Sequence, residues 1–413
     1  MKSIYKIQLS FLILFLAWAQ AMAIAPEEAL KQFIKESGVP AGSMAVKIVD
    51  LKDGSTMASH NSSLPLVPAS ILKSVTTATL LEHVGTDWRY HTRVYIDGPT
   101  DMGILRGNII VVGCCDPSLN SNVEPFGTDI ITEITENLRY LNINRIEGNI
   151  LIDESEFYGN PRPASWAAAD HKKAYGTGCH ALNFNNNSKG DFSVERPHEL
   201  FLSQLKSSLA AADIPVDGKT FEGGRRIQLL DHVSQPVDEI MRSCMMRSDN
   251  LFAESMLRTY GKLSGGDGSV EDSSMRELSF CQEKGYPMSG IVIRDGSGLS
   301  RENRVTADFM EAILSGNSGN PDYASFFPFA GQEGTLRKFL ADTPLDSYIA
   351  MKTGSMTGIQ CYAGYRLDDD YVPTHVIVVI MNDIGKSRDR VKKATENMLL
   401  NIFDTHENSS DNG

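Results

Sequence analysis

The chain has 413 residues, of which 41% are hydrophobic and 22% are charged, and its formal net charge is −13. This length allows one large domain or about two to three small ones, and the composition is that of a globular protein with a hydrophobic core. The acidic balance argues against nucleic acid as a partner, because phosphate binding needs clustered lysine and arginine.

The N-terminal segment has the pattern of a signal peptide. Lys2 and Lys6 precede an apolar run over residues 7–18, and a small-x-small triplet follows at residues 21–23. We predict cleavage after Ala23 and export of the mature chain. The run is short for a membrane anchor, and no later apolar run has spanning length, so we expect no transmembrane anchor in the mature chain.

The first elements of the mature chain are predicted to be a helix, a hairpin and a second helix. The first helix covers residues 26–37, with proline in its first turn and Gly38 at its end. The hairpin turns at residues 52–54, Lys-Asp-Gly. The second helix opens at Ser70 and runs to about Val84.

A different pattern fills residues 88–224. Short apolar runs separated by glycines and acidic residues indicate strands, and amphipathic helices are predicted over residues 129–141 and 199–214. We interpret this region as a self-contained α+β domain inserted into the rest of the chain.

After the inserted region, long helices return, with a polar interruption near Ser248. Adjacent strands are predicted at residues 347–367 and 374–382, followed by a helix at residues 387–403 and a polar tail at residues 404–413. The overall class is α/β (α+β). The main domain is discontinuous and is formed by residues 24–87 and 225–413.

Six cysteines are spread along the chain. An exported protein can form disulfides, but this chain is long enough to have a core without them. We expect mostly free buried thiols, with at most one or two disulfides. No C-x-x-C spacing indicates a zinc site, and we predict neither a metal nor a cofactor. The cysteines are Cys114, Cys115, Cys179, Cys244, Cys281 and Cys361.

Three short patterns occur in an order and context that favour a catalytic role. They are Ser70-x-x-Lys73 at a predicted helix start, Ser248-Asp249-Asn250 in the polar interruption, and Lys352-Thr353-Gly354 in a predicted strand. Second copies of the first two patterns have unsuitable contexts. Ser203 and Lys206 lie inside a predicted helix, and residues 410–412 lie in the tail.

The chemistry of these residue types fits acyl transfer by a serine. The Ser70 hydroxyl is a poor nucleophile until a base takes its proton, and Lys73, three positions on in a helix, lies on the same face. Lys73 acts as a base only when neutral, so burial and a positive neighbour such as Lys352 must lower its pKa. An N–H group at the helix start and the N–H of Ser355 would form the oxyanion hole. Ser248 would pass a proton to the leaving group.

The remaining motif residues are expected to bind the substrate. Asn250 would hydrogen-bond the substrate amide, and Lys352 and Thr353 would bind its terminal carboxylate. The strand that carries them offers an edge along which a peptide can pair, and Gly354 would let the substrate approach closely.

This motif set resembles that of the penicillin-recognising serine acyltransferases. Most of the mature chain is similar to the class C low-molecular-mass penicillin-binding proteins, the D-alanyl-D-alanine carboxypeptidase/endopeptidases. The segments that carry the resemblance lie at residues 175–187, 248–254, 295–306 and 331–340.

The resemblance implies a β-lactamase-like penicillin-recognising domain and hydrolysis of peptidoglycan stem peptides through an acyl-enzyme on Ser70. It also implies covalent inhibition by β-lactams and a periplasmic location. The family places inserted domains between the first two motifs. We predict that the second of these insertions is absent, because the helix near Glu199 follows Asn187 closely.

Two other functions remain open at this point. A serine β-lactamase on the same scaffold would need fast deacylation, often through an extra acid, but no Glu-x-x-x-Asn element lies in a suitable place between the first two motifs. An inactive scaffold that binds cell-wall peptide would have no need for the intact set of motif residues.

Overall fold

The computed structural model describes residues 25–123, 126 and 129–403. The predicted signal peptide with its cleavage after Ala23, and the predicted tail at residues 404–413, therefore lie outside the described residues. Within the described part of the chain, none of the helices has the length and apolar character needed to span a bilayer.

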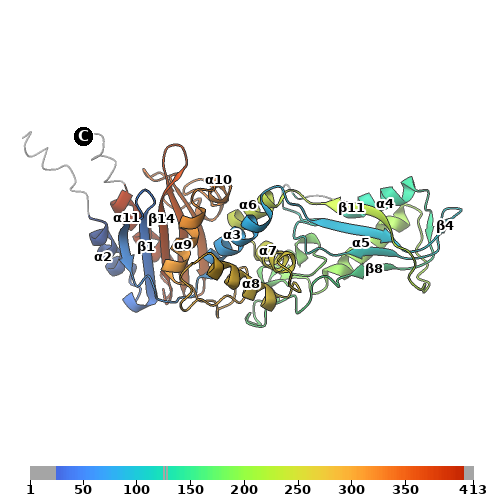
Figure 1. The fold of residues 1–413 in the computed structure, drawn as a ribbon, viewed down its shortest axis with the longest axis horizontal. Coiled ribbons are helices and arrows are strands. Elements are labelled where there is room, and N and C mark those ends of the chain that lie inside the picture. Colours follow the sequence, from blue (N-terminus) through green and yellow to red (C-terminus); the bar gives the residue numbers. More distant parts are fainter. Residues whose placement is uncertain (1–24, 124–125, 127–128, 404–413) are drawn as a thin grey trace, which may run out of the picture.

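A five-stranded antiparallel sheet brings the two ends of the described chain together (Figure 1). Its order is β12-β13-β14-β1-β2, and the register pairs Met44 of β1 with Met381 of β14. β1 and β2 form the predicted hairpin. The segment 347–367 forms two strands joined by a tight turn, where one strand was predicted. The bounds are Met44–Asp50 (β1), Thr56–His60 (β2), Ile349–Met356 (β12), Ile359–Leu367 (β13) and Pro373–Met381 (β14).

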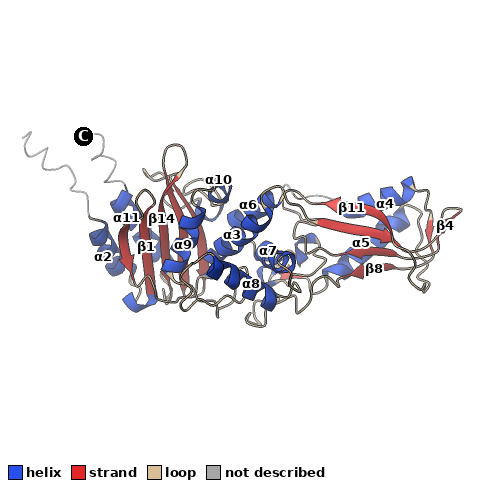
Figure 2. Cartoon of the chain, viewed as in Figure 1, coloured by secondary structure: helices blue, strands red, loops and turns tan. Residues whose placement is uncertain are grey.

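Helices cover both faces of this sheet (Figure 2). On one face, α2 and α11 share a hydrophobic core with alternate residues of β1 and β14. The other face packs against a cluster of helices from the middle of the chain. The bounds are Pro26–Ser37 (α2), Lys73–Val84 (α3), Val237–Arg247 (α6), Asn250–Leu263 (α7), Val270–Glu283 (α8), Ala307–Asn317 (α9), Pro321–Ser325 (α10) and Arg388–Phe403 (α11).

A second sheet lies at the far end of the elongated molecule (Figure 1). Its order is β11-β3-β6-β8, and it shares a separate hydrophobic core with α4 and α5. The bounds are His91–Ile96 (β3), Ile109–Val112 (β6), Ile150–Asp153 (β8), Ile227–Val233 (β11), Ile130–Tyr140 (α4) and Pro197–Ala211 (α5). Short strands complete this part, namely Thr100–Asp101 (β4), Ile104–Leu105 (β5), Arg145–Ile146 (β7), Ser188–Lys189 (β9) and Phe192–Ser193 (β10).

The structure extends the inserted region at one boundary. Strand β11 pairs with β3 along residues 227–233, so the second sheet continues past the boundary predicted at residue 224. The region has its own hydrophobic core, and the loops between β8 and α5 also contact α7 and the loop of Asp295. The Trp166 indole donates to Asp295, and Arg258 of α7 donates to the carbonyl of Cys179.

The connection after Asn187 is short. Only the hairpin of β9 and β10 separates it from α5, which begins at Pro197. For this reason we propose that the chain lacks the second insertion of the family it resembles.

The cysteines are free thiols in this structure, and all but Cys114 are buried. The Cys115 and Cys179 sulfurs lie 3.4 Å apart, beside the contact between the inserted region and α7.

Candidate active site

Ser70 lies in a tight turn that leads into a buried helix. Residues Ala69–Leu72 form a 3₁₀ turn, and α3 begins at Lys73, three residues later than the helix start predicted from the sequence. Ala69 has a φ of 47°, a conformation that residues with a side chain seldom adopt, which sets the direction in which the turn leaves Pro68. Ser70 is half-buried and lies on the wall of two adjoining cavities.

Lys73 is completely buried and its amine has three hydrogen-bond partners. Nζ lies 3.0 Å from Ser70 Oγ, 2.7 Å from Asn250 Oδ1 and 2.7 Å from the carbonyl oxygen of Ser297. The structure thus joins the first two motifs through the bond between Lys73 and Asn250, which the sequence did not predict. The carbonyl of Ser297 is a third partner that the motifs do not include.

Burial lowers the pKa of Lys73. Cys244 and the carboxyl groups of Asp295, Glu254 and Asp249 act in the opposite direction, but burial is the largest effect. The neutral form of the amine, which a base requires, is thus more populated at neutral pH than in a solvent-exposed lysine.

The second motif connects two helices. Helix α6 ends at Arg247, and Ser248 takes the left-handed conformation with a φ of 59°. The Asp249 carboxylate caps α7 by accepting from the N–H of Phe252. This sharp turn places Ser248 on the wall of both cavities, beside Ser70.

Asn250 is held from two sides. Its Oδ1 accepts from Lys73, and its Nδ2 donates to the carbonyl of Tyr175 at 2.8 Å. A bond to the substrate amide, as predicted, would have to compete with the bond to Tyr175. The site therefore uses a main-chain group from the inserted region to orient a motif residue.

The third motif lies on β12 at the edge of the five-stranded sheet. Lys352 is completely buried, and its Nζ donates to the carbonyl of Thr353 at 2.9 Å. Burial, and then the charge of Lys73, lower the pKa of Lys352 to about 7. Thr353 and Ser355 line the cavities, whereas Lys352 is not among the lining residues. The contact of Lys352 with the substrate carboxylate stays a prediction.

The role predicted for Gly354 needs correction. A side chain at this position would meet the carbonyl oxygen of Pro68 at 2.6 Å and the nitrogens of Ser70 and Ile71 at 3.1 Å. The space in front of Gly354 is thus occupied by the chain's own nucleophile turn and not left for substrate. The glycine lets β12 pack directly against Ser70, on the side where the N–H groups of Ser70 and Ser355 are expected to meet.

Two adjoining cavities, of about 380 and 430 Å³, share Ser70, Ser248, Ser355 and Arg388. Further residues of the first cavity include Asp170, Tyr175, Asn250, Leu299, Arg301 and Met356. Those of the second include Thr335, Lys338, Thr353, Gln360, Tyr362 and Lys392. The second cavity has three cationic side chains and one carboxylate, that of Asp389, on its wall, and this net positive balance suits an anionic group.

Asp295 is a positioning residue that motif reasoning did not single out. Its carboxylate accepts four hydrogen bonds, at 2.6 to 2.9 Å, and so fixes the loop that presents the Ser297 carbonyl to Lys73. The four donors are the Trp166 indole, the amide of Asn303 and the main-chain N–H groups of Gly298 and Ser300. The family-like segment at residues 295–306 was the only sequence signal for it.

Glu254 has a similar supporting position. The side chain is completely buried, and its Oε1 accepts from the N–H of Ser297 at 2.8 Å. Burial and the nearby Asp295 raise the pKa of Glu254 to about 8, so a proton is bound at neutral pH. Glu254 therefore steadies the same peptide unit from within α7.

The fold and this site define a class. A buried amine beside a serine hydroxyl, in a turn packed on the edge of an antiparallel sheet, is the arrangement of a serine hydrolase that works through an acyl-enzyme. The model of the D-Ala-D-Ala carboxypeptidase 3 (S13) family matches residues 27–190 and 185–402. The chain belongs to this family, which confirms the resemblance found in its sequence.

Named relatives agree with this assignment. Carboxypeptidase DacB of Mycolicibacterium smegmatis is 27% identical over 350 residues, which cover 79% of this chain and 74% of the relative. D-alanyl-D-alanine carboxypeptidase DacB of Haemophilus influenzae is 24% identical over 392 residues, with 76% of this chain and 80% of the relative covered.

Solved structures share the fold. Penicillin binding protein 4 of Haemophilus influenzae superposes with a TM-score of 0.77 at 20% identity, covering 90% of this chain and 98% of that chain. The predatory endopeptidase Bd0816 of Bdellovibrio bacteriovorus gives 0.54 at 16% identity, covering 88% and 93%. The predicted α+β penicillin-recognising fold is confirmed.

Proposed function

We propose that this protein is a serine D-alanyl-D-alanine carboxypeptidase that acts on peptidoglycan stem peptides through an acyl-enzyme on Ser70. The observation that carries the proposal is the position of Lys73. Its amine is fully buried, lies 3.0 Å from Ser70 Oγ and is held by two further acceptors.

The acylation step begins with neutral Lys73. Two N–H bonds of the amine point to Asn250 and to the Ser297 carbonyl, which directs the lone pair at the Ser70 hydroxyl. The hydroxyl proton passes to Nζ while Oγ attacks the carbonyl carbon of the penultimate D-alanine. The N–H groups of Ser70 and Ser355 stabilise the oxyanion that forms.

Collapse of the tetrahedral intermediate breaks the bond between the two D-alanines. Lys73 returns its proton through the Ser248 hydroxyl to the departing nitrogen, so that D-alanine leaves with a neutral amine. Water then attacks the acyl carbonyl and gives a proton to Lys73, and Ser70 leaves as a hydroxyl after taking that proton.

The terminal carboxylate of the substrate would lie in the second cavity. The hydroxyls of Thr353 and Ser355 line it, donating to Thr335 and Gln360 in this structure, and would turn to the carboxylate when substrate binds. Arg388 lies on the wall that the two cavities share. We assign Lys352 an electrostatic role in this scheme. Two buried ammonium groups repel each other, which disfavours a proton on Lys352 and Lys73 at the same time.

The same acyl transfer would also cleave peptide cross-bridges whose donor residue is D-alanine. The proposed function therefore includes a DD-endopeptidase activity. β-Lactams would acylate Ser70 as substrate mimics. Export through the predicted signal peptide would place the protein in the periplasm, where its substrate lies.

A product assay tests the activity. The mature protein is incubated with a peptide ending in D-Ala-D-Ala, and released D-alanine is quantified beside a matched peptide ending in D-Ala-L-Ala. We expect release from the first peptide by wild type and none by Ser70→Ala. Equal release by both proteins, or no release by wild type from either this peptide or a cross-linked muropeptide dimer, would refute the proposal.

The competing function, a β-lactamase, differs in the fate of the acyl-enzyme. A covalent β-lactam adduct that persists over many minutes supports the peptidase, whereas multiple turnovers per minute would support the β-lactamase.

A further inference from the structure

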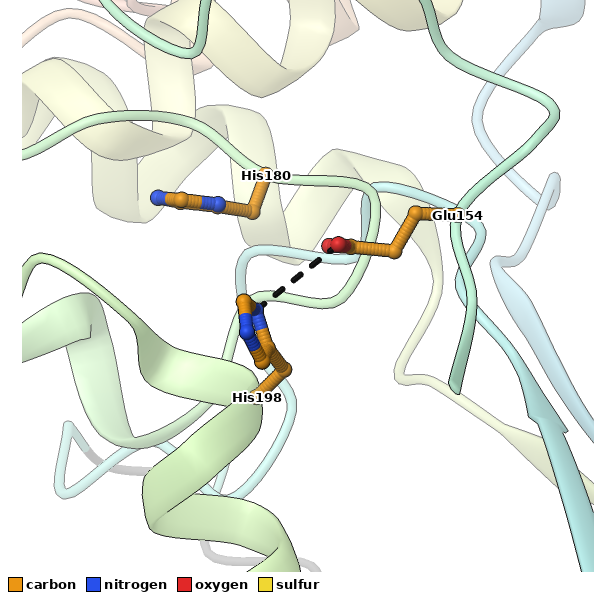
Figure 3. Close-up of side chains that lie close together, drawn as sticks. All are labelled: Glu154, His180 and His198. Atoms are coloured by element: carbon orange, nitrogen blue, oxygen red, sulfur yellow. Dashed lines mark ion pairs between the residues drawn. The ribbon is translucent and has the colours of Figure 1, made fainter. Parts of the chain in front are cut away.

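Three side chains with metal-binding atoms meet outside the active site (Figure 3). Glu154 follows β8, His180 lies in the loop between Gly176 and Asn185, and His198 lies in the first turn of α5. One ligand atom from each lies within 4.8 Å of the other two. The residues are far apart in the sequence, so no spacing pattern indicates the cluster.

The cluster has unused coordinating capacity. Nδ1 of His198 is buried and forms no hydrogen bond, and its contact with Glu154 Oε2, at 3.7 Å, is longer than a hydrogen bond. A buried ring nitrogen without a partner carries a free-energy cost that a ligand can remove.

The side chains are also accessible. Those of His198 and Glu154 are 28% and 36% exposed, so an ion can enter and keep a water molecule. The ring of His180 lies beside that of His198, with 6.3 Å between the ring centroids and an angle of 67° between the planes.

We propose that Glu154, His180 and His198 bind a divalent transition-metal ion, with Zn²⁺ as the best fit. Two imidazoles and one carboxylate with a water in the fourth position form a common tetrahedral zinc set. The ligand atoms need to close by about 1 Å to reach the spacing that Zn–N and Zn–O bonds of roughly 2.1 Å impose.

Two arginine side chains lie near the cluster, and their positive charges oppose the binding of a cation. Both side chains are held by other partners, which reduces this effect. Arg162 forms an ion pair with Glu195 at 2.7 Å, and the guanidinium of Arg258 donates to main-chain carbonyls.

An ion here would connect three segments of the chain. The end of β8, the first turn of α5 and the loop of His180 have no strand pairing with one another at this point. Tyr175 lies in the turn Ala174–Gly176, directly before this loop, and its carbonyl orients Asn250 in the active site. The metal would thus stabilise the inserted region and the wall of the active site without touching the substrate.

Calorimetric titration of the chelator-treated mature protein with Zn²⁺ tests the site. We expect one ion per chain and a higher melting temperature when zinc is present. His180→Ala, His198→Ala and Glu154→Gln should each weaken zinc binding by at least tenfold, since even the loss of outer-shell partners costs about 10–100-fold. His91→Ala is the matched control, because His91 also pairs with a carboxylate, Asp231, but has no third ligand.

The outcomes separate the site from adventitious binding. Zinc bound equally by the wild type and the three variants, or no zinc bound by the wild type, overturns the proposal. If a histidine variant melts lower without zinc, the comparison uses Glu154→Gln in its place, because the Glu154 side chain is more exposed than that of His198. Co²⁺ gives a second readout, since a four-coordinate site produces visible absorption that these variants should lose.

Discussion

The two motif lysines illustrate how burial, and not residue type alone, produces the chemistry of the site. Lys73 and Lys352 are both completely shielded from solvent, and each has a lowered pKa. Their presence and spacing could be predicted from the sequence. Their burial could not, because it depends on loops such as that of Ser297, which lies more than two hundred positions away in the chain.

The first prediction concerns the pH dependence of acylation. Because neutral Lys73 is the base, the acylation rate should rise with pH as this amine loses its proton. Asn250→Asp places a carboxylate at the atom that now accepts from Nζ at 2.7 Å, which favours the charged amine. The rising limb of the profile for a β-lactam should therefore move to higher pH.

Asn137→Asp provides the control for this measurement, because it adds a carboxylate on α4, far from Lys73. Its profile should match that of the wild type. A profile of Asn250→Asp that stays in place, or moves to lower pH, would exclude Lys73 as the base.

The second prediction separates stability from activity at Lys352. Its pKa is about 7 in the folded protein, against 10.5 for an ordinary lysine. Between these values the unfolded chain binds a proton that the folded protein lacks, so the contribution to the free energy of unfolding rises with pH from 7 to about 10. Below pH 7 the contribution is at its lowest.

Lys352→Met should therefore stabilise the fold by about 1–4 kcal/mol at pH 6, and by less at pH 9. Acylation should fall, because Lys73 loses its positive neighbour. Urea unfolding at the two pH values measures the effect, with the exposed Lys35→Met as a control that should show no such pH dependence. Destabilisation at both pH values would mean that the buried amine is a net stabilising contact.

At the scale of elements, the contact between β12 and the nucleophile turn decides whether the site forms. Gly354→Ala should push these elements apart, because the added methyl group would lie 2.6 Å from the carbonyl oxygen of Pro68. We expect a loss of about 1–3 kcal/mol in stability and a drop in acylation of more than tenfold. Gly319→Ala is the control, since nothing lies within 4 Å of its added carbon.

The packing role of Gly354 would be contradicted if Gly354→Ala acylated at the rate of the wild type, or if Gly319→Ala lost as much activity.

Local patterns predicted many of these elements, and the misses have physical causes. The helix at residues 26–37 was predicted to the residue, because proline, two acids and Gly38 mark its ends. Residues 347–367 were read as one strand, since β12 and β13 are both buried and so show no clear alternation at their turn near Thr357. The three motifs were placed on helix, loop and strand, but the packing role of Gly354 depends on tertiary contact.

At the scale of the whole molecule, the inserted region and the catalytic sheet are linked through the active site. The Trp166 indole donates to the Asp295 carboxylate at 2.8 Å, and that carboxylate fixes the loop that contacts Lys73. The sequence indicated that a region was inserted. It did not indicate that this region supplies contacts to the site, because these contacts come from irregular loops without a periodic pattern.

The hydrogen bond between Trp166 and Asp295 can be tested by substitution. Trp166→Phe keeps an aromatic ring but removes the indole N–H that donates to the Asp295 carboxylate. The loss of this bond to a charged acceptor should cost about 1.5–3 kcal/mol of stability. Acylation should slow as well, since the loop of Asp295 becomes less constrained. Trp88→Phe, in which the ring packs against Tyr90 and the hydrophobic core, is the control and should acylate normally. Normal acylation by Trp166→Phe would show that the inserted region does not support the site.

The central claim is that Ser70 is the nucleophile of an acyl-enzyme. The most direct measurement is to incubate the mature protein with a fluorescent penicillin and locate the label by peptide mass spectrometry. We predict one label per chain, on Ser70, with none on Ser70→Ala and a rate reduced by about 10²–10⁴-fold in Lys73→Ala. A wild type that takes no label, or a Ser70→Ala protein that is labelled equally, would contradict the mechanism.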